Sequence, residues 1–179
     1  MKELLEKTAE LIGEGMTEEL FRTLELFEGG KRLCVKEVQE TVKTGKSVSA
    51  ASQRLERLYR TGFLEREKEG TSTYYRLSEK GERLLKGFSG ADSKEITLLR
   101  YPDYLPVLLA AGGYSLITPS FAASVLGIPP SRVRKVLAYL NQLGFLRRKG
   151  RGVYLLTERG RKAVERAERA GIQADSNKA

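Results

Sequence analysis

The segment SRVRKVLAYLNQLG (131–144) precedes FLRRKGRGVYLL (145–156) and TERG (157–160). Its apolar residues at 133, 136, 137 and 140 have the spacing of an amphipathic helix. Gly144 is placed to end that helix. Two strand-like runs follow, at 145–147 and 153–156, and the turn between them is basic and contains glycine. The segment therefore predicts a helix, a hairpin and a further helix that starts at Thr157.

The same outline occurs earlier in the chain. Adding 82 to the residue number takes 49–64 onto 131–146, and adding 79 takes 75–81 onto 154–160. The difference of three residues falls in the hairpin turn, where insertions are tolerated. A register kept through a helix and a hairpin predicts two copies of one module.

Composition limits the classes of function. A chain of 179 residues with 40% apolar residues is long enough for two domains of about 80 residues each. Cys34 is the only cysteine and there is no histidine, which excludes a disulfide within the chain and argues against a metal site or a histidine catalyst. We expect no enzyme activity and no cofactor, because no nucleophile has a partner base. The charged fraction of 31% is typical of thermophilic proteins.

Charge is distributed unevenly between the two halves. The net charge is +9, of which residues 1–90 contribute +1 and residues 91–179 contribute +8. A basic surface attracts polyanions by long-range attraction and by release of condensed counterions. No apolar run approaches the roughly 18 residues of a membrane span, and the N-terminus lacks a secretory pattern. We therefore expect a cytoplasmic, nucleoid-associated protein with no membrane partner.

Turn and linker residues divide the chain. Asp103 and Ser120 are candidate helix caps in the second module, and Thr17 and Ser78 in the first. Glycine and serine between 87 and 93 predict a linker. The expected organisation is an N-terminal amphipathic helix at 1–16, a first module at 17–88, a linker at 89–101, a second module at 102–171 and a disordered tail at 172–179.

The order helix, short strand, helix, turn, helix, hairpin, helix occurs twice, and each copy ends in Tyr-x-Leu-Ser/Thr-Glu-Lys/Arg-Gly. This pattern resembles winged-helix transcriptional regulators of the MarR, PadR and ArsR kind, over residues 17–86 and 102–170. The resemblance implies a mainly α fold with small β-hairpin wings (α+β), in two winged helix-turn-helix domains. It also implies a regulator that binds double-stranded DNA, with one helix of each module in the major groove and the wing on the backbone or minor groove.

Carried over onto this sequence, the resemblance selects polar residues on both modules. Arginine can pair with a guanine edge and glutamine with adenine, whereas serine and lysine commonly hold phosphates. The expected DNA-contacting residues are Ser131, Arg132, Arg134, Lys135, Arg147, Arg148, Lys149 and Arg151 in the second module, and Lys46, Ser49, Ser52, Gln53 and Arg57 in the first.

The first module departs from this pattern. Its wing carries Glu65, Glu67 and Glu69, which would repel phosphate, so the second module is expected to make most of the DNA contact. An alternative is a tandem winged-helix scaffold, similar in layout to ScpB-type subunits of chromosome-segregation complexes. Such a protein would hold a protein partner on its first module, with DNA contact secondary.

The N-terminal helix has no obvious place in either module. Its apolar residues Leu4, Leu5, Leu11 and Ile12 could pack against a second copy in a homodimer, or against the tail helix at 158–170 of the same chain. Two modules in one chain could alternatively mimic a dimer and read two half-sites.

Overall fold

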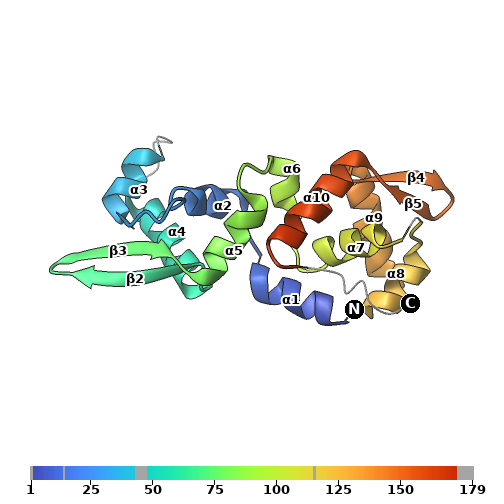
Figure 1. Ribbon diagram of the computed structural model, residues 1–179, viewed down its shortest axis with the longest axis horizontal. Helices are drawn as coiled ribbons and strands as arrows, with labels where there is room; N and C mark the ends of the chain where they lie inside the picture. The colour runs from blue at the N-terminus through green and yellow to red at the C-terminus, as the bar shows by residue number, and fades with distance from the viewer. Residues whose placement is uncertain (1, 14, 43–47, 115, 173–179) are drawn as a thin grey trace.

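The protein is a helix-rich mixed α/β molecule with two small antiparallel sheets (Figure 1). A computed structural model describes residues 2–13, 15–42, 48–114 and 116–172. The first half comprises α1 (Lys2–Ile12), α2 (Glu18–Glu25), β1 (Leu33–Cys34), α3 (Val35–Thr41), α4 (Val48–Arg60), β2 (Leu64–Glu69), β3 (Ser72–Leu77) and α5 (Glu79–Phe88). The second half comprises α6 (Ser93–Thr97), α7 (Tyr104–Gly112), α8 (Pro119–Leu126), α9 (Pro130–Gln142), β4 (Leu146–Gly150), β5 (Val153–Leu156) and α10 (Glu158–Arg169).

The two halves are built alike. In each, a hairpin follows a long helix and leads into a capped helix, and its second strand pairs with an earlier segment. Strand β3 pairs with β1 through Leu33 and Tyr75, and β5 pairs with Ile117 through Tyr154. Tyr75 and Tyr154 are both buried. The second hairpin strand thus pairs with an earlier segment at the same place in each half. The strand order is β1-β3-β2 in the first sheet and β4-β5 in the second.

Hydrogen bonds at the end of each hairpin also correspond. The Ser78 hydroxyl donates to the carbonyl of Gly62 at 2.5 Å and caps α5, and the Thr157 hydroxyl donates to the carbonyl of Gly144 at 2.6 Å and caps α10. A Cβ added at Gly81 would lie 2.3 Å from a carbonyl oxygen, and one at Gly160 would lie 2.2 Å from the corresponding oxygen. Glycine at both places therefore lets the helix start directly against the turn that leads into the hairpin.

The predicted linker forms part of the buried core. Asp92 and Glu95 make a reciprocal capping box that starts α6. The apolar side chains of Ile96, Leu98 and Leu99 are almost completely buried. The predicted linker at 89–101 is therefore an ordered connection, because the apolar residues just after the glycines pack into the core.

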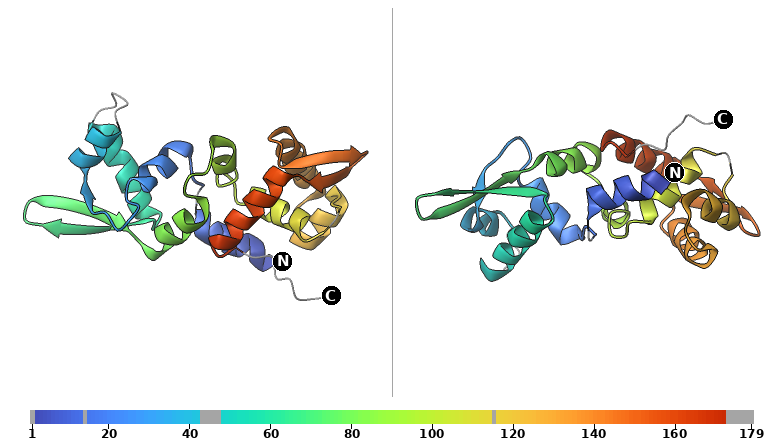
Figure 2. Two further views of the ribbon diagram at one scale, coloured as in Figure 1. Left: turned by 45° about the horizontal axis from the view of Figure 1, so that its top comes forward. Right: turned by 90° about the horizontal axis from the view of Figure 1, so that it is seen from below.

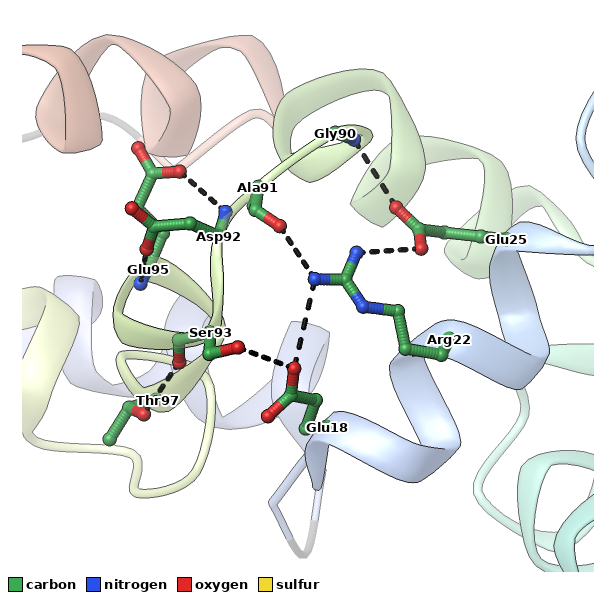
Figure 3. Close-up of polar contacts among 9 residues, drawn as sticks. All are labelled: Glu18, Arg22, Glu25, Gly90, Ala91, Asp92, Ser93, Glu95 and Thr97. Carbon is green, nitrogen blue, oxygen red and sulfur yellow. Dashed lines mark hydrogen bonds and ion pairs between the residues drawn. The ribbon is translucent and has the colours of Figure 1, made fainter. Parts of the chain in front are cut away.

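Hydrogen bonds hold residues 90–93 against α2 of the first half (Figure 3). The Arg22 guanidinium donates to the carbonyl of Ala91 at 3.0 Å and to the Glu25 carboxylate at 2.9 Å. Glu25 in turn accepts the main-chain N–H of Gly90 at 3.2 Å, and Glu18 accepts the Ser93 hydroxyl at 2.6 Å. Side chains of α2 therefore hold the chain where it passes between the halves.

Helix α1 packs within its own chain. Leu4, Leu11 and Ile12 are at most 3% exposed, and Leu5 is partly buried against the same core. The helix lies against α7 and α8 of the second half. The apolar face that was suggested to join a second copy or the tail helix is thus buried within the chain, with α7 and α8 as its principal neighbours.

Two predicted caps have other roles. Helix α8 is capped by Thr118, whose hydroxyl accepts the N–H of Phe121 at 3.2 Å, and Ser120 lies inside the helix. Asp103 precedes α7 but makes no side-chain cap bond. In the described part of the chain, no helix is long and apolar enough to cross a membrane.

Candidate nucleic-acid interface

Helix α9 presents one face to the core and the opposite face to solvent. Val133, Val136, Leu137 and Leu140 are buried. Since 3.6 residues make a turn, the opposite face is centred on residues such as Lys135. The three basic residues of α9 therefore point in different directions. Lys135 lies near the middle of the exposed face, and Arg132 and Arg134 lie at its two borders.

Arg132 already has an anionic partner. Its guanidinium donates two hydrogen bonds to Asp103, one of them 3.2 Å long between the terminal nitrogen and Oδ1. This hydrogen bond raises the pKa of Arg132 above its ordinary value. Asp103 is 8% exposed, so its charge is turned toward Arg132 and away from solvent. Arg132, a predicted DNA contact, is exposed but already paired with a carboxylate of its own chain.

Arg134 and Lys135 retain uncompensated charge. Both side chains are exposed, and within the described residues neither forms an ion pair. Ser131 is exposed at the first turn of the same helix. These three residues form the predicted helix contact that the fold leaves open to solvent.

The β4–β5 hairpin separates its basic residues by strand alternation. Arg147 lies opposite Leu155 and lines a depression of about 730 Å³ between the hairpin, the end of α7 and the start of α10. Arg148 lies on the other face of the strand, opposite Tyr154. Its main-chain N–H donates to the Asn141 side chain of α9 at 3.1 Å. The hairpin is thereby tied to the helix beside it.

Lys149 and Arg151 lie at the tip of the hairpin, where the strand register shifts. Both are exposed and, in the part of the chain that the structure covers, neither has a carboxylate within ion-pair distance. Arg148 bends back to donate to the Gly150 carbonyl at 3.0 Å. The predicted wing therefore offers two extended cations at its tip, with Arg148 close behind them.

In the first half, the predicted contact residues occupy the outer face of α4. Ser49, Ser52, Gln53 and Arg57 are exposed. Ser52, Gln53 and Arg57 line a shallow depression of about 620 Å³. Lys46 lies outside the described residues. The face carries hydrogen-bonding groups but less charge than the corresponding face of α9.

The acidic hairpin of the first half is neutralised by neighbouring arginines. Glu65 pairs with Arg76 at 2.9 Å, and Arg32 pairs with Glu67 at 3.7 Å and also with Glu69. The Arg32 guanidinium also lies 4.2 Å from the centre of the Tyr74 ring. These pairs reduce the repulsion of phosphate that the three glutamates by themselves imply, but the side chains are exposed and contribute little to stability.

The predicted contact helices share one side of the molecule. In the right view of Figure 2, α4 and α9 both lie along the lower edge, and the two hairpins extend toward opposite ends. Sequence reasoning did not identify Asp103 as the partner of Arg132, since the two are 29 positions apart. It also missed Asn141, whose polar side chain at the exposed end of an amphipathic helix was the available signal.

Across the described ranges there is no group of cysteine, aspartate and glutamate side chains that could hold a metal ion. No protein-family model matches the chain, and no curated protein matches it. Among solved structures the chain is similar to the hypothetical protein PyrSV_gp04 from Pyrobaculum spherical virus, at 16% identity and a TM-score of 0.30, over 80% of this chain and 99% of that one. A likeness this distant supports no conclusion about fold or function.

Proposed function

We propose that the protein binds duplex DNA as a transcriptional regulator built from two winged helix-turn-helix units, and that it is not an enzyme. In this interpretation α9 is the recognition helix of the second unit and the β4–β5 hairpin is its wing. The corresponding elements of the first unit are α4 and the β2–β3 hairpin. The repeated element order supports this interpretation, as do the matching bonds around Ser78 and Thr157.

One observation carries the proposal. Exposed cations lie on α9 (Arg134, Lys135) and at the tip of the hairpin that Asn141 ties to α9 (Lys149, Arg151), and no carboxylate of the described residues pairs with them. A helix enters the major groove while a neighbouring hairpin reaches the backbone in known docking geometries. Four unpaired cations placed this way suit a phosphate-lined groove, since each phosphate neutralised releases counterions.

The test is a titration of a generic duplex at several salt concentrations. The double variant Lys135→Ala, Lys149→Ala should bind more weakly, and its salt slope should fall by about two units, because each phosphate contact contributes roughly 0.9. The matched control is Lys162→Ala, Arg169→Ala, which removes the same charge from exposed positions on α10. Equal binding by the two double variants, or no binding by the parent, would overturn the proposal.

A protein partner is the second candidate function. Tyr114, Leu116 and Phe121 are exposed by 45%, 48% and 36%, and the rings of Tyr114 and Phe121 pack edge to face. Exposed apolar groups gathered in one place are typical of interaction surfaces. Recovery of one stoichiometric partner that is lost in Phe121→Ser, together with no footprint on any DNA, would favour this function.

A further inference from the structure

The two halves exchange their leading helices. Helix α1 precedes α2 in the chain but packs against α7, and α6 precedes α7 but packs against α2. Since α2 and α7 are the first helices of the two repeated units, each unit covers the first helix of the other. This reciprocity is the pattern of an isologous interface. In such an interface, element i of one copy contacts element j of the other, and element j of the first contacts element i of the second.

The centre of the junction joins corresponding positions. Adding 79 to Gly87 gives Arg166, and the two meet where α5 crosses α10: a Cβ at Gly87 would lie 2.4 Å from the Arg166 carbonyl oxygen. Nearby, the main-chain N–H of Met16 donates to the carbonyl of Leu99 at 2.9 Å. Met16 immediately precedes the first unit and Leu99 closely precedes the second, so residues at similar places ahead of the two units are hydrogen-bonded to each other. Contacts between equivalent positions are expected next to a two-fold axis.

The arrangement of elements agrees with such an axis. In Figure 1, half a turn in the plane of the picture exchanges α6 at the top with α1 at the bottom, and the left hairpin with the right one. An axis along that view leaves α4 and α9 on the same face, as the right view of Figure 2 shows. The two helices therefore have the mutual placement of recognition helices in a two-fold symmetric dimer.

Polar contacts hold the halves in this arrangement. Arg166 donates to the Glu95 carboxylate at 3.1 Å and to the carbonyls of Gly87 and Ser89 at 3.3 and 2.9 Å. The side chains of Arg166 and Glu95 are only 20% and 12% exposed. Arg159 of α10 pairs at 3.1 Å with Asp92, the N-cap of α6, which ties α10 to the segment that connects the halves. The spacing of α4 and α9 is consequently set by the fold.

We propose that a single chain binds DNA as a built-in dimer, with α4 and α9 in two successive major-groove segments on one face of the duplex. This inference rests on the proposed function and adds the form of its target: two half-sites in inverted orientation. The half-sites differ in sequence, because α9 offers Arg134 and Lys135 at the positions where α4 has Ser52 and Gln53, and Tyr139 where α4 has Arg57. The half read by α4 should include an adenine for Gln53, whose amide can pair with that base.

Selection of bound duplexes from a random pool, followed by footprinting, tests this target. The expected consensus has two unlike inverted halves centred about 10 base pairs apart, which is one helical turn. Inserting about five base pairs between them turns one half to the far side of the duplex. Affinity for the interrupted duplex should then fall to that of the α9 half alone. Mass measurement of the complex should show one chain per full site.

A variant of α4 separates this inference from the proposed function. Gln53→Ala, Arg57→Ala should weaken binding to the full site by about tenfold or more and leave binding to the α9 half alone unchanged. Both side chains are exposed, so the fold should be retained, which circular dichroism checks. If the variant binds the full site like the parent, or if two chains occupy it, the built-in dimer is overturned while DNA binding stands. If the parent binds no duplex, the proposed function itself fails.

Discussion

Gly87 of α5 and Arg166 of α10 touch at corresponding positions of the two repeated units, with space between them for a hydrogen atom but not for a methyl group. A Cβ at Gly87 would approach the Arg166 carbonyl oxygen to 2.4 Å and the Cβ of Ala170 to 2.7 Å. At this point α5 and α10, the equivalent helices of the two halves, approach each other closely through their backbones. Any side chain at Gly87 must push α5 and α10 apart.

Gly87→Ala should lower the free energy of unfolding. In an open helix this change stabilises by about 1 kcal/mol, whereas overpacking against backbone costs about 1–3 kcal/mol. Urea denaturation followed by circular dichroism measures the difference. The control is Gly113→Ala, where the added Cβ would lie 3.9 Å from its nearest neighbours and the backbone is right-handed. A Gly87 variant as stable as this control would contradict the close approach.

Loss of the Ser78 or the Thr157 cap should lower the temperature of a single unfolding transition that both halves share. Ser78→Ala and Thr157→Ala remove equivalent caps from opposite halves, and each should cost about 1 kcal/mol. Because α1, α6 and the α5–α10 contact join the halves into one core, we expect a single cooperative transition in both variants. Differential scanning calorimetry measures this. Two separate transitions, with each variant moving only one of them, would show that the halves fold independently.

Leu11→Ala should destabilise the protein without changing its mass in solution. Leu11 is 2% exposed and lies in the common core, so its truncation should cost about 2–5 kcal/mol. Leu5→Ala is the control on the same helix, and it should cost less because Leu5 is only partly buried. Sedimentation at micromolar concentration should give the mass of one chain for the parent and both variants. A stable dimer that Leu11→Ala dissociates would contradict the packing of α1 within its own chain.

Asp103→Asn should strengthen binding to generic duplex DNA severalfold at low salt. The change keeps the size of the side chain but removes the charge that neutralises Arg132, which frees one more cation and steepens the salt slope by up to about one unit. Glu158→Gln changes the net charge equally on α10, where its partner is Arg161, and should have a smaller effect. Fluorescence anisotropy at several salt concentrations measures both slopes. Identical slopes for the two variants would show that Arg132 does not reach the duplex.

Local sequence determined the helices and hairpins. The apolar spacing along 133–140 and the glycine at 144 predicted α9 and its end, and the correspondence between 75–81 and 154–160 predicted matching hairpins and caps. Such features depend on neighbours within a few turns, so periodicity and turn residues reveal them. The excess of positive charge in the second half was likewise visible in the residue order.

Only the tertiary structure decided how the halves meet and which charges stay free. The placement of α1 on α7, the contact of Gly87 with Arg166 and the pairing of Arg132 with Asp103 join residues separated by tens of positions. No period in the sequence reports such contacts, because they arise from the fit of whole helices against one another. The sequence by itself therefore specified two similar units and their charge. The packing between the units determined which basic residues remain exposed and that α4 and α9 lie on one face.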